Sequence, residues 1–209
     1  LATQLGYSEQ TQQLLTTMAA GVLILPFFLF SAMGGQLADK FPKQRVMQGV
    51  KMFEIGIAVM GSMSLYTAWL PLCYLTIFAL GTHSAIFAPS KYSILPQHLD
   101  QKELIGGNAL LNTGTFLAIL LGTIIGTVAM GVEAGVYIVS ALMFITAIVG
   151  LISSFKIPNA PPKDATLKFS FNPFSETFAV MKYPLHQPKD LTLSMLGKAW
   201  FWLIGSMFM

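Results

Sequence analysis

The sequence predicts an all-α polytopic membrane protein, for two reasons: its composition and the placement of its charges. Hydrophobic residues make up 54% of the 209 residues and charged residues only 10%, with a mean hydropathy of +0.65. Soluble globular domains carry about 25% charged residues, so this chain lacks the polar surface needed to enclose one core in water. The charges also cluster, leaving four stretches of 22 to 36 residues without Asp, Glu, Lys or Arg.

The uncharged stretches predict where the chain crosses the bilayer. About 20 apolar residues span a hydrocarbon core of roughly 30 Å. The stretch between Glu54 and Lys91 holds 36 residues, too many for one span, and Pro71 near its middle divides it. Continuous runs of this length favour helices over the short alternating strands of a barrel. We therefore expect spanning helices over 12–35, 45–68, 71–89, 106–130 and 134–155, and a sixth from near residue 195.

The connections between these spans alternate in charge. Lys and Arg gather in 36–45, 90–105 and 156–198, whereas the connections near Pro71 and Gly131 carry neither. By the positive-inside rule the basic connections are cytoplasmic. The first residues then lie outside, so we interpret the chain as a piece of a larger protein in which one further span precedes it. On that count it holds helices 2–6 and the start of helix 7.

This arrangement divides the chain into three units. We expect a transmembrane bundle over 1–156, a cytoplasmic connection over 157–194 and the beginning of a second bundle over 195–209. The connection opens with prolines that cannot continue a helix. Farther on, Asn172-Pro173 forms an N-cap and first-turn pair. Apolar residues at helical spacing then predict a short amphipathic helix at the membrane interface, the alternative being a solvated tether: Phe174, Phe178 and Met181.

Two ionisable side chains lie at membrane depth and are candidates for a transport pathway. Glu54 is nine residues from Arg45, roughly 13 Å along a helix, and one turn from Lys51. His83 is eight residues from Lys91, at a similar depth. Such groups are expensive in a bilayer and usually face a cavity or a partner. The alternatives are a Lys51–Glu54 pair that only neutralises itself and a His83 that only hydrogen-bonds within the packing.

The span over 106–130 carries two stripes. Its polar stripe has residues at i, i+4 and i+7, and inside a membrane these face protein or water: Asn108, Asn112 and Thr115. The polar stripe suits either the lining of a cavity or hydrogen bonding between helices. A stripe of small residues recurs every four positions and predicts close helix packing: Gly114, Ala118, Gly122 and Gly126.

The first basic connection contains a recognisable motif. The run from Gly34 to Arg45 resembles the signature of the major facilitator superfamily between its second and third helices, Gly-x-Leu-Ala-Asp-(Arg/Lys)-x-Gly-(Arg/Lys), with Pro42 where the family usually has Gly. The alternative is an ordinary positive-inside loop. The resemblance implies two six-helix halves and a conformational latch at this connection. The residues that we assign to the latch are Gly35, Asp39, Lys43 and Arg45.

A second block is similar to a narrower family. The run Lys91-Tyr92-Ser93-Ile94-Leu95-Pro96, the triplet from Asn108 to Leu110 and the run from Gly114 to Gly122 resemble the lysophospholipid transporter family. Asn112 departs from that pattern, because an acidic residue is common there. The resemblance implies alternating-access movement of lysophosphatidylethanolamine-like lipids across the bacterial inner membrane. It also implies an acyltransferase partner, fused or separate, that re-acylates them.

We therefore expect a transporter in the cell inner membrane with membrane lipid and lysophospholipid as its partners. The substrate-binding candidates are Glu54, His83, Lys91, Asn108, Asn112 and Thr115. Lys91 either meets the lipid phosphate or only extends its ammonium to the interface. The alternative function is a facilitator-type exporter of drugs or other small molecules with proton coupling. The sequence contains no acyltransferase box, nucleophile elbow, metal-spaced His/Cys set or basic patch with interleaved aromatics, so we expect no enzyme, metal, cofactor or nucleic-acid partner.

Overall fold

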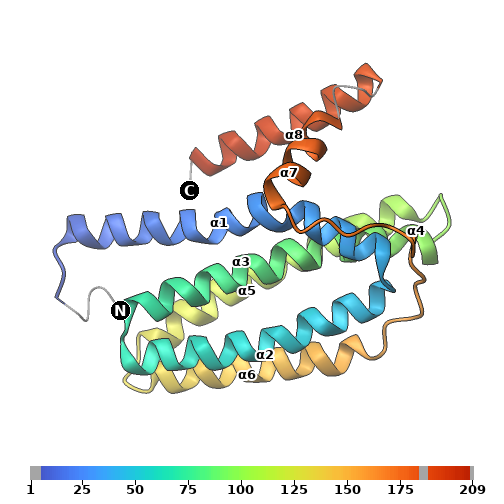
Figure 1. Cartoon of the computed structure of the whole chain (residues 1–209). Helices are drawn as coiled ribbons and strands as arrows, with labels where there is room; N and C mark the ends of the chain where they lie inside the picture. The colour runs from blue at the N-terminus through green and yellow to red at the C-terminus, as the bar shows by residue number, and fades with distance from the viewer. Residues whose placement is uncertain (1–5, 184–187, 208–209) are drawn as a thin grey trace.

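A computed structural model describes residues 6–183 and 188–207, and its regular elements are all helices (Figure 1). The described helices run roughly parallel or antiparallel, apart from two short ones, α4 and α7. In chain order they are α1 (Glu9–Lys40), α2 (Lys43–Thr67), α3 (Leu70–Ser93), α4 (Leu95–His98), α5 (Leu104–Met130), α6 (Gly135–Ser154), α7 (Pro173–Lys182) and α8 (Lys189–Met207). The predicted all-α fold is confirmed. The ends of the first and last predicted units, residues 1–5 and 208–209, lie outside the described residues.

The bundle is built on α3. The α3 helix packs against α1 on one side and α2 on the other, α2 in turn packs against α6, and α5 lies beside α6 (Figure 1). The order α1–α3–α2–α6–α5 brings helices far apart in sequence together. It also leaves a space between α3 and α5 that is described below as a groove.

Reciprocal glycine–proline contacts hold α1 against α3. A Cβ atom on Gly34 of α1 would lie 2.7 Å from the Ala85 carbonyl oxygen and 3.3 Å from the Pro89 ring on α3. The Ala85 carbonyl lacks its helical donor, because Pro89, four residues later, has no N–H. Gly34 has no side chain, so α1 can approach this turn of α3 closely. The reverse contact places Gly81 of α3 against the Pro26 turn of α1. Close backbone approach of this kind is how helices pack in a membrane.

The basic connections meet at one end of the bundle. The α1–α2 corner hydrogen-bonds to the segment after α6, through the Lys43 amide and the Ala160 carbonyl oxygen at 3.0 Å. The Gln97 side chain of α4 reaches the same segment, at the Pro161 carbonyl oxygen. At the opposite end the α2–α3 and α5–α6 turns come together, where Tyr66 and Tyr137 make an edge-to-face contact. All three basic connections therefore share one face, as expected for a membrane bundle.

Several predicted boundaries are wrong. The first span is α1, which extends to Lys40, so most of the loop predicted over 36–45 is helical and the turn shrinks to Phe41-Pro42. The predicted break at Pro89 does not occur either, because α3 continues through it to Ser93. Gly34 of α1 packs closely against this turn of α3. The division near Pro71 is confirmed: α2 ends at Thr67, its C-cap residue Ala68 is in a left-handed conformation, and α3 starts at Leu70.

Within the described residues, four helical segments are long and apolar enough to cross a bilayer: Glu9–Lys40, Leu70–His98, Leu104–Met130 and Gly135–Ser154. The predicted span over 45–68 forms α2, a helix of spanning length. By composition α2 does not qualify, because four charged residues lie in its first half: Lys43, Arg45, Lys51 and Glu54. It is instead sheltered between α3 and α6. Two of its charged residues, Lys51 and Glu54, line the groove described below.

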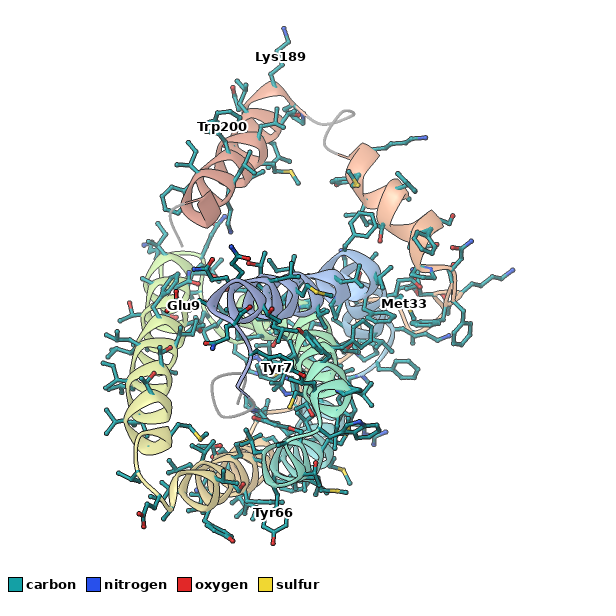
Figure 2. The ribbon with its side chains drawn as sticks, turned by 90° about the vertical axis from the view of Figure 1, so that its left-hand side faces the viewer. Tyr7, Glu9, Met33, Tyr66, Lys189 and Trp200 are labelled. Carbon is teal, nitrogen blue, oxygen red and sulfur yellow. The ribbon has the colours of Figure 1, made fainter. Side chains whose placement is uncertain are left out.

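Apolar side chains cover the outside of the bundle. On α5, Ile105 is 83% exposed and Leu110 77% exposed. Figure 2 looks along the helices and shows Tyr66 at the rim of α2, with α8, which carries Lys189 and Trp200, on the other side of the molecule. So much exposed apolar surface on long helices is the property of a membrane protein, whose outer surface meets lipid rather than water.

The segment after α6 contains the predicted amphipathic helix. The Asn172 side chain accepts a hydrogen bond from the Ser175 amide at 3.2 Å, and Pro173 occupies the first turn of α7. The N-cap prediction is thus confirmed. The Thr177 hydroxyl donates to the Phe28 carbonyl oxygen of α1 at 2.9 Å, so α7 packs on the bundle. The α8 helix begins at Lys189 rather than near 195, and Figure 1 draws it apart from the other long helices. The assignment of 157–194 and 195–209 as separate units stays a prediction.

Candidate functional site

A groove of about 1100 Å³ runs between α3 and α5, with α2 at its inner side. Its wall is mainly apolar, and Leu80 and Phe87 of α3 face Leu111 and Ile119 of α5 across it. The polar side chains that line it come from three helices: Lys51, Glu54, His83, Ser84, Lys91 and Thr115. A long apolar space with a few polar groups is the usual form of a site for an amphipathic ligand.

The inner part of the groove holds an ionisable cluster. The Lys51 ammonium lies 2.6 Å from Glu54 Oε2, and His83 Nε2 lies 3.4 Å from the same oxygen. The Phe87 ring stacks on the His83 ring at 5.9 Å between centroids, and the Lys51 ammonium lies 5.3 Å from the centroid of Phe87. Gly150 of α6 makes room for the Lys51 stem. Two basic groups, the Lys51 ammonium and the His83 ring, therefore lie beside the Glu54 carboxylate. The cluster joins α2 to α3.

Lys91 has a different environment. Its ammonium donates to Thr115 Oγ1 at 3.2 Å and lies 4.9 Å from the centroid of the Tyr92 ring. The Thr115 hydroxyl donates its own proton to the Leu111 carbonyl oxygen at 2.7 Å, so its oxygen is left to accept from Lys91. In the part of the chain that the structure describes, no carboxylate lies within ion-pairing distance of Lys91. Lys91 therefore presents an uncompensated positive charge to a largely apolar groove.

The predicted polar stripe on α5 divides in the structure. Thr115 lines the groove, whereas Asn108 and Asn112 are not among the lining residues. The Asn108 amide donates to the Leu104 carbonyl oxygen of its own helix at 2.8 Å. Asn112 accepts a hydrogen bond from the Tyr92 hydroxyl at 2.8 Å, which joins α5 to α3. Of the two interpretations of the stripe, Thr115 fits a cavity lining and Asn112 fits a bond between helices.

The stripe of small residues does not make the close packing that the sequence predicts. Apart from the adjoining residues and backbone of α5 itself, no described atom lies within 4 Å of a Cβ placed on Gly114, Gly122 or Gly126. Gly114, Ala118 and Gly122 instead form part of the groove wall. Small side chains therefore widen the groove here.

The four candidate latch residues lie along the α1–α2 corner. Gly35 and Asp39 are in the last turns of α1, and Lys43 and Arg45 are in the first turn of α2. A Cβ on Gly35 would meet nothing within 4 Å. The close contact with α3 is made by the adjacent residue, Gly34. The Lys43 residue is only 2% exposed, while Arg45 is exposed. The Asp39 backbone carbonyl accepts from the Asp164 amide at 3.0 Å.

The segment that covers this corner ends in a tight turn. The Thr166 hydroxyl and amide donate to Asp164 Oδ1 at 2.6 and 2.9 Å. Since both bonds favour the charged carboxylate, the hydroxyl first and the amide second, they lower the pKa of Asp164. The turn is therefore stabilised above the ordinary pKa of an aspartate, and this contribution is lost as the pH falls.

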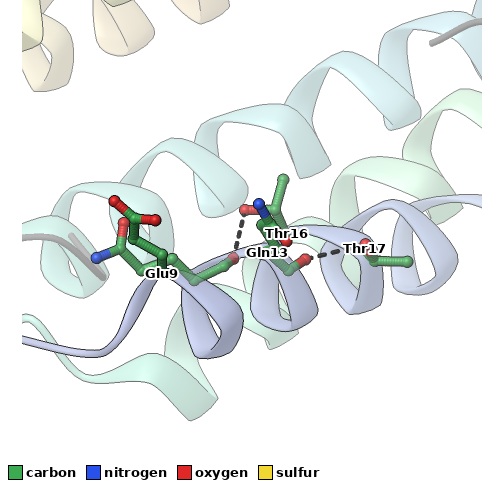
Figure 3. A pocket seen from close by; sticks show the side chains of 5 residues that line it. Glu9, Gln13, Thr16 and Thr17 are labelled. Atoms are coloured by element: carbon green, nitrogen blue, oxygen red, sulfur yellow. Dashed lines mark hydrogen bonds between the residues drawn. The ribbon is translucent and has the colours of Figure 1, made fainter.

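A second hollow lies at the other end of α1, and it is no site. All its lining residues come from one helix, and Figure 3 shows them along a single ribbon: Glu9, Gln12, Gln13, Thr16 and Thr17. The Thr16 and Thr17 hydroxyls donate to the carbonyls of their own preceding turn. Among the described residues, no group of three or more His, Cys, Asp or Glu side chains is placed to hold a metal ion.

Comparison with known families decides the class of the protein. The family model described as Major Facilitator Superfamily matches residues 1–209, the whole of the chain. The chain belongs to the major facilitator superfamily. The resemblance to this superfamily that the sequence predicts is confirmed.

Several facilitator relatives carry the name "Lysophospholipid transporter LplT". The one from Enterobacter sp. (strain 638) is 28% identical over 201 residues, covering 95% of this chain and 47% of the relative. The one from Klebsiella pneumoniae (strain 342) is 28% identical over 207 residues, covering 98% and 49%. The one from Escherichia fergusonii is 30% identical over 202 residues, covering 95% and 47%. The chain thus spans about half the length of these relatives. No solved structure gives a significant match.

The candidate residues chosen from the sequence left out three residues whose side chains make notable contacts in the structure. Tyr92 was only part of a motif, yet it contacts both Lys91 and Asn112. Lys51 is the direct partner of Glu54, and the spacing of one turn was the signal for it. Gln44 hydrogen-bonds to a segment more than 100 residues away, which no local pattern indicates.

Proposed function

We propose that the protein moves lysophospholipids, lysophosphatidylethanolamine-like in chemistry, across the bacterial inner membrane by alternating access. The observation that carries this proposal is Lys91, a cation without an acidic partner among the described residues, at the edge of a long apolar groove. A lysophospholipid has one phosphate and one acyl chain, which match the cation and the apolar wall. The names of the facilitator relatives support the same substrate class.

Within this proposal each groove residue has a role. Lys91, held by Thr115, binds the phosphate by a charge-assisted hydrogen bond. Glu54 and His83 receive the amine of the headgroup deeper in the bundle, and Glu54 is the anion that attracts it. Asn108 and Asn112 support the route from α5 rather than bind the lipid directly. The two bundles of a facilitator would rock about this site.

The corner residues have a separate role in the proposal. Gly35, Asp39, Lys43 and Arg45 form a latch that holds one access state, with Asp39 as its charged centre. Its test is Asp39→Asn in the full-length protein, with cysteine accessibility measured from both sides of the membrane. We expect labelling to shift toward the cytoplasmic side, and an unaltered pattern would count against the latch. The basic connections are cytoplasmic in this orientation, and an acyltransferase, fused or separate, re-acylates the lipid that arrives there.

The test of the transport activity is uptake of labelled lysophosphatidylethanolamine by spheroplasts that express the full-length protein. Glu54→Gln and Lys91→Met should each reduce uptake at equal protein level. The matched control is Lys102→Met, which removes an exposed lysine from the connection between α4 and α5. Unchanged uptake in both groove variants would show that the groove is not the substrate-binding site.

A second function, proton-coupled export of drugs or other small molecules, is favoured by one contact. Glu54 and His83 lie 3.4 Å apart, close enough for a proton to be exchanged between two titratable groups. The two functions differ in competition: excess lysophospholipid should block uptake of the labelled lipid, and a panel of cationic drugs should not. Drug efflux that depends on a proton gradient and ignores lysophospholipid would favour the second function.

A further inference from the structure

The segment after α6 runs in an extended form across the α1–α2 corner before it reaches α7 (Figure 1). We call residues 157–164 the strap. The strap lies more than 100 residues from the corner in sequence, and it carries Pro158, Pro161 and Pro162. Prolines restrict the undocked chain to extended conformations, so less conformational entropy is lost when the strap is fixed.

The first turn of α2 binds the strap at Ala160. The Gln44 carboxamide donates to Asn159 Oδ1 at 2.6 Å and accepts from the Ala160 amide at 2.9 Å. The Lys43 amide donates to the Ala160 carbonyl oxygen at 3.0 Å. Both backbone groups of Ala160 are therefore paired, and the residue is 0% exposed.

These bonds complete the ends of two helices. The N-cap of α2 is Pro42, whose side chain caps nothing; its carbonyl accepts from the Arg45 and Val46 amides, and the Lys43 amide uses an acceptor outside the helix. The Ala160 carbonyl oxygen supplies it. At the end of α1 the Asp39 carbonyl is an acceptor without a helical partner, and the Asp164 amide supplies the donor. One short segment thus caps both helices of the corner.

The strap also reaches a third helix. The Pro161 carbonyl oxygen accepts from Gln97 of α4 at 3.1 Å and from the Lys43 ammonium at 3.4 Å. The strap covers Lys43, which has only 2% of its surface exposed. Apart from Ala160, these contacts are polar and several lie at the surface. Segments with few buried apolar contacts open locally without unfolding the protein.

We propose that the α1–α2 corner is a docking site for the strap, and that docking fixes the positions of the ends of α1, α2 and α4 relative to one another. The strap follows α6 and leads, through residues 165–172, to α7, so it lies on the covalent path from the bundle to α7 and α8. Release of the strap therefore frees the corner, and docking holds it. This inference does not depend on what the groove transports.

The first test is limited trypsin digestion of the full-length protein in inverted membrane vesicles, with cleavage after Lys156 and Lys168 followed by mass spectrometry. Both lysines are exposed and flank the docked residues. Gln44→Leu removes the two bonds of the carboxamide and should speed cleavage at both sites about tenfold. Gln44→Glu keeps the acceptor for Ala160 and should give a smaller increase. Gln13→Leu, an exposed glutamine at the far end of α1, is the matched control.

A substitution in the strap itself controls for the possibility that the Gln44 variants act by destabilising α2. Ala160 is fully buried, so the ring of Ala160→Phe does not fit and should release the strap. The substitution leaves the sequence of every helix unchanged, and it should speed the same two cleavages. Gln44→Leu combined with Ala160→Phe should add little to either single change, because both remove the same docked state. Cleavage as slow as in the wild type in both single variants would overturn the docking site.

The second test measures the corner itself. Spin labels at the exposed positions Phe41 and Lys102 report the distance from the α1–α2 turn to the connection after α4. Gln44→Leu and Ala160→Phe should each broaden the distance distribution, and Gln13→Leu should not. Faster cleavage with an unchanged distribution would show that the strap docks without fixing the helix ends, and would overturn that part of the proposal.

Discussion

The Tyr92 hydroxyl on α3 donates a hydrogen bond of 2.8 Å to the Asn112 side-chain oxygen on α5. One residue earlier, the Lys91 ammonium reaches Thr115 on the same partner helix. Two adjacent residues of α3 thus hold α5 in place along the groove. The ring of Tyr92 also lies beside the Lys91 ammonium, so one side chain both joins the helices and positions the cation.

Tyr92→Phe tests the first of these roles. The change removes the bond to Asn112 and keeps the ring beside Lys91, so we expect a loss of about 1 kcal/mol in the stability of the bundle and only a modest loss of uptake. Thermal unfolding in detergent and lysophospholipid uptake are the measurements. Tyr66→Phe is the control, because Tyr66 is 72% exposed on the rim of α2. Equal melting temperatures for the two variants would show that the bond contributes no stability.

Lys91 should be needed for its charge and not for its length alone. Lys91→Met keeps most of the apolar stem and should lower uptake at least about tenfold, since a charge-assisted bond to phosphate is lost. Lys91→Arg should retain part of the activity. If Lys91→Met transports as well as the wild type, the phosphate is bound elsewhere.

Glu54 and Lys51 should depend on each other. Their side chains are 24% and 21% exposed, and removing one partner leaves a largely desolvated charge. Glu54→Gln should therefore lower the unfolding free energy by about 1–3 kcal/mol, and the double change with Lys51→Met should recover part of the loss. Thermal melts of the four proteins give the coupling. Strictly additive losses would mean that the ion pair does not contribute as such.

Adjacent glycines on α1 should respond in opposite ways. Gly34→Ala places a methyl group 2.7 Å from a backbone oxygen of α3, so α1 and α3 must separate and the protein should lose stability. Gly35→Ala meets open space and should be neutral or gain up to about 1 kcal/mol from helix propensity. The comparison of their melting temperatures needs no other control. A larger loss for Gly35→Ala would contradict the α1–α3 packing.

Local signals predicted the elements well where they act within one helix. The uncharged stretches predicted α1, α3, α5 and α6, and Pro71 marked the turn between α2 and α3. Asn172 and Pro173 gave the start of α7. The helix ends were less accurate: α3 continues through Pro89, at a turn against which Gly34 of another helix packs closely. A proline read in isolation cannot show that its unpaired carbonyl is accommodated.

The candidate site shows the same division. Spacing placed Glu54 and His83 at similar depth, and the structure brings them to 3.4 Å. Spacing also placed Asn108, Asn112 and Thr115 on one stripe, but only Thr115 lines the groove. Which part of a stripe faces a cavity depends on how the helix is rotated against its neighbours, and one helix's periodicity does not contain that angle.

By itself the sequence determined that this chain is a set of membrane helices, because bilayer thickness and the cost of buried charge act on each segment separately. It also determined the family, since the facilitator motifs are contiguous runs of residues. Only the tertiary structure decided which glycine meets which proline, that Lys91 lacks an acidic partner among the described residues, and that residues 157–164 cap the corner of α1 and α2. Those relationships join positions up to 125 residues apart, and they depend on helix order and rotation, which the whole bundle sets together.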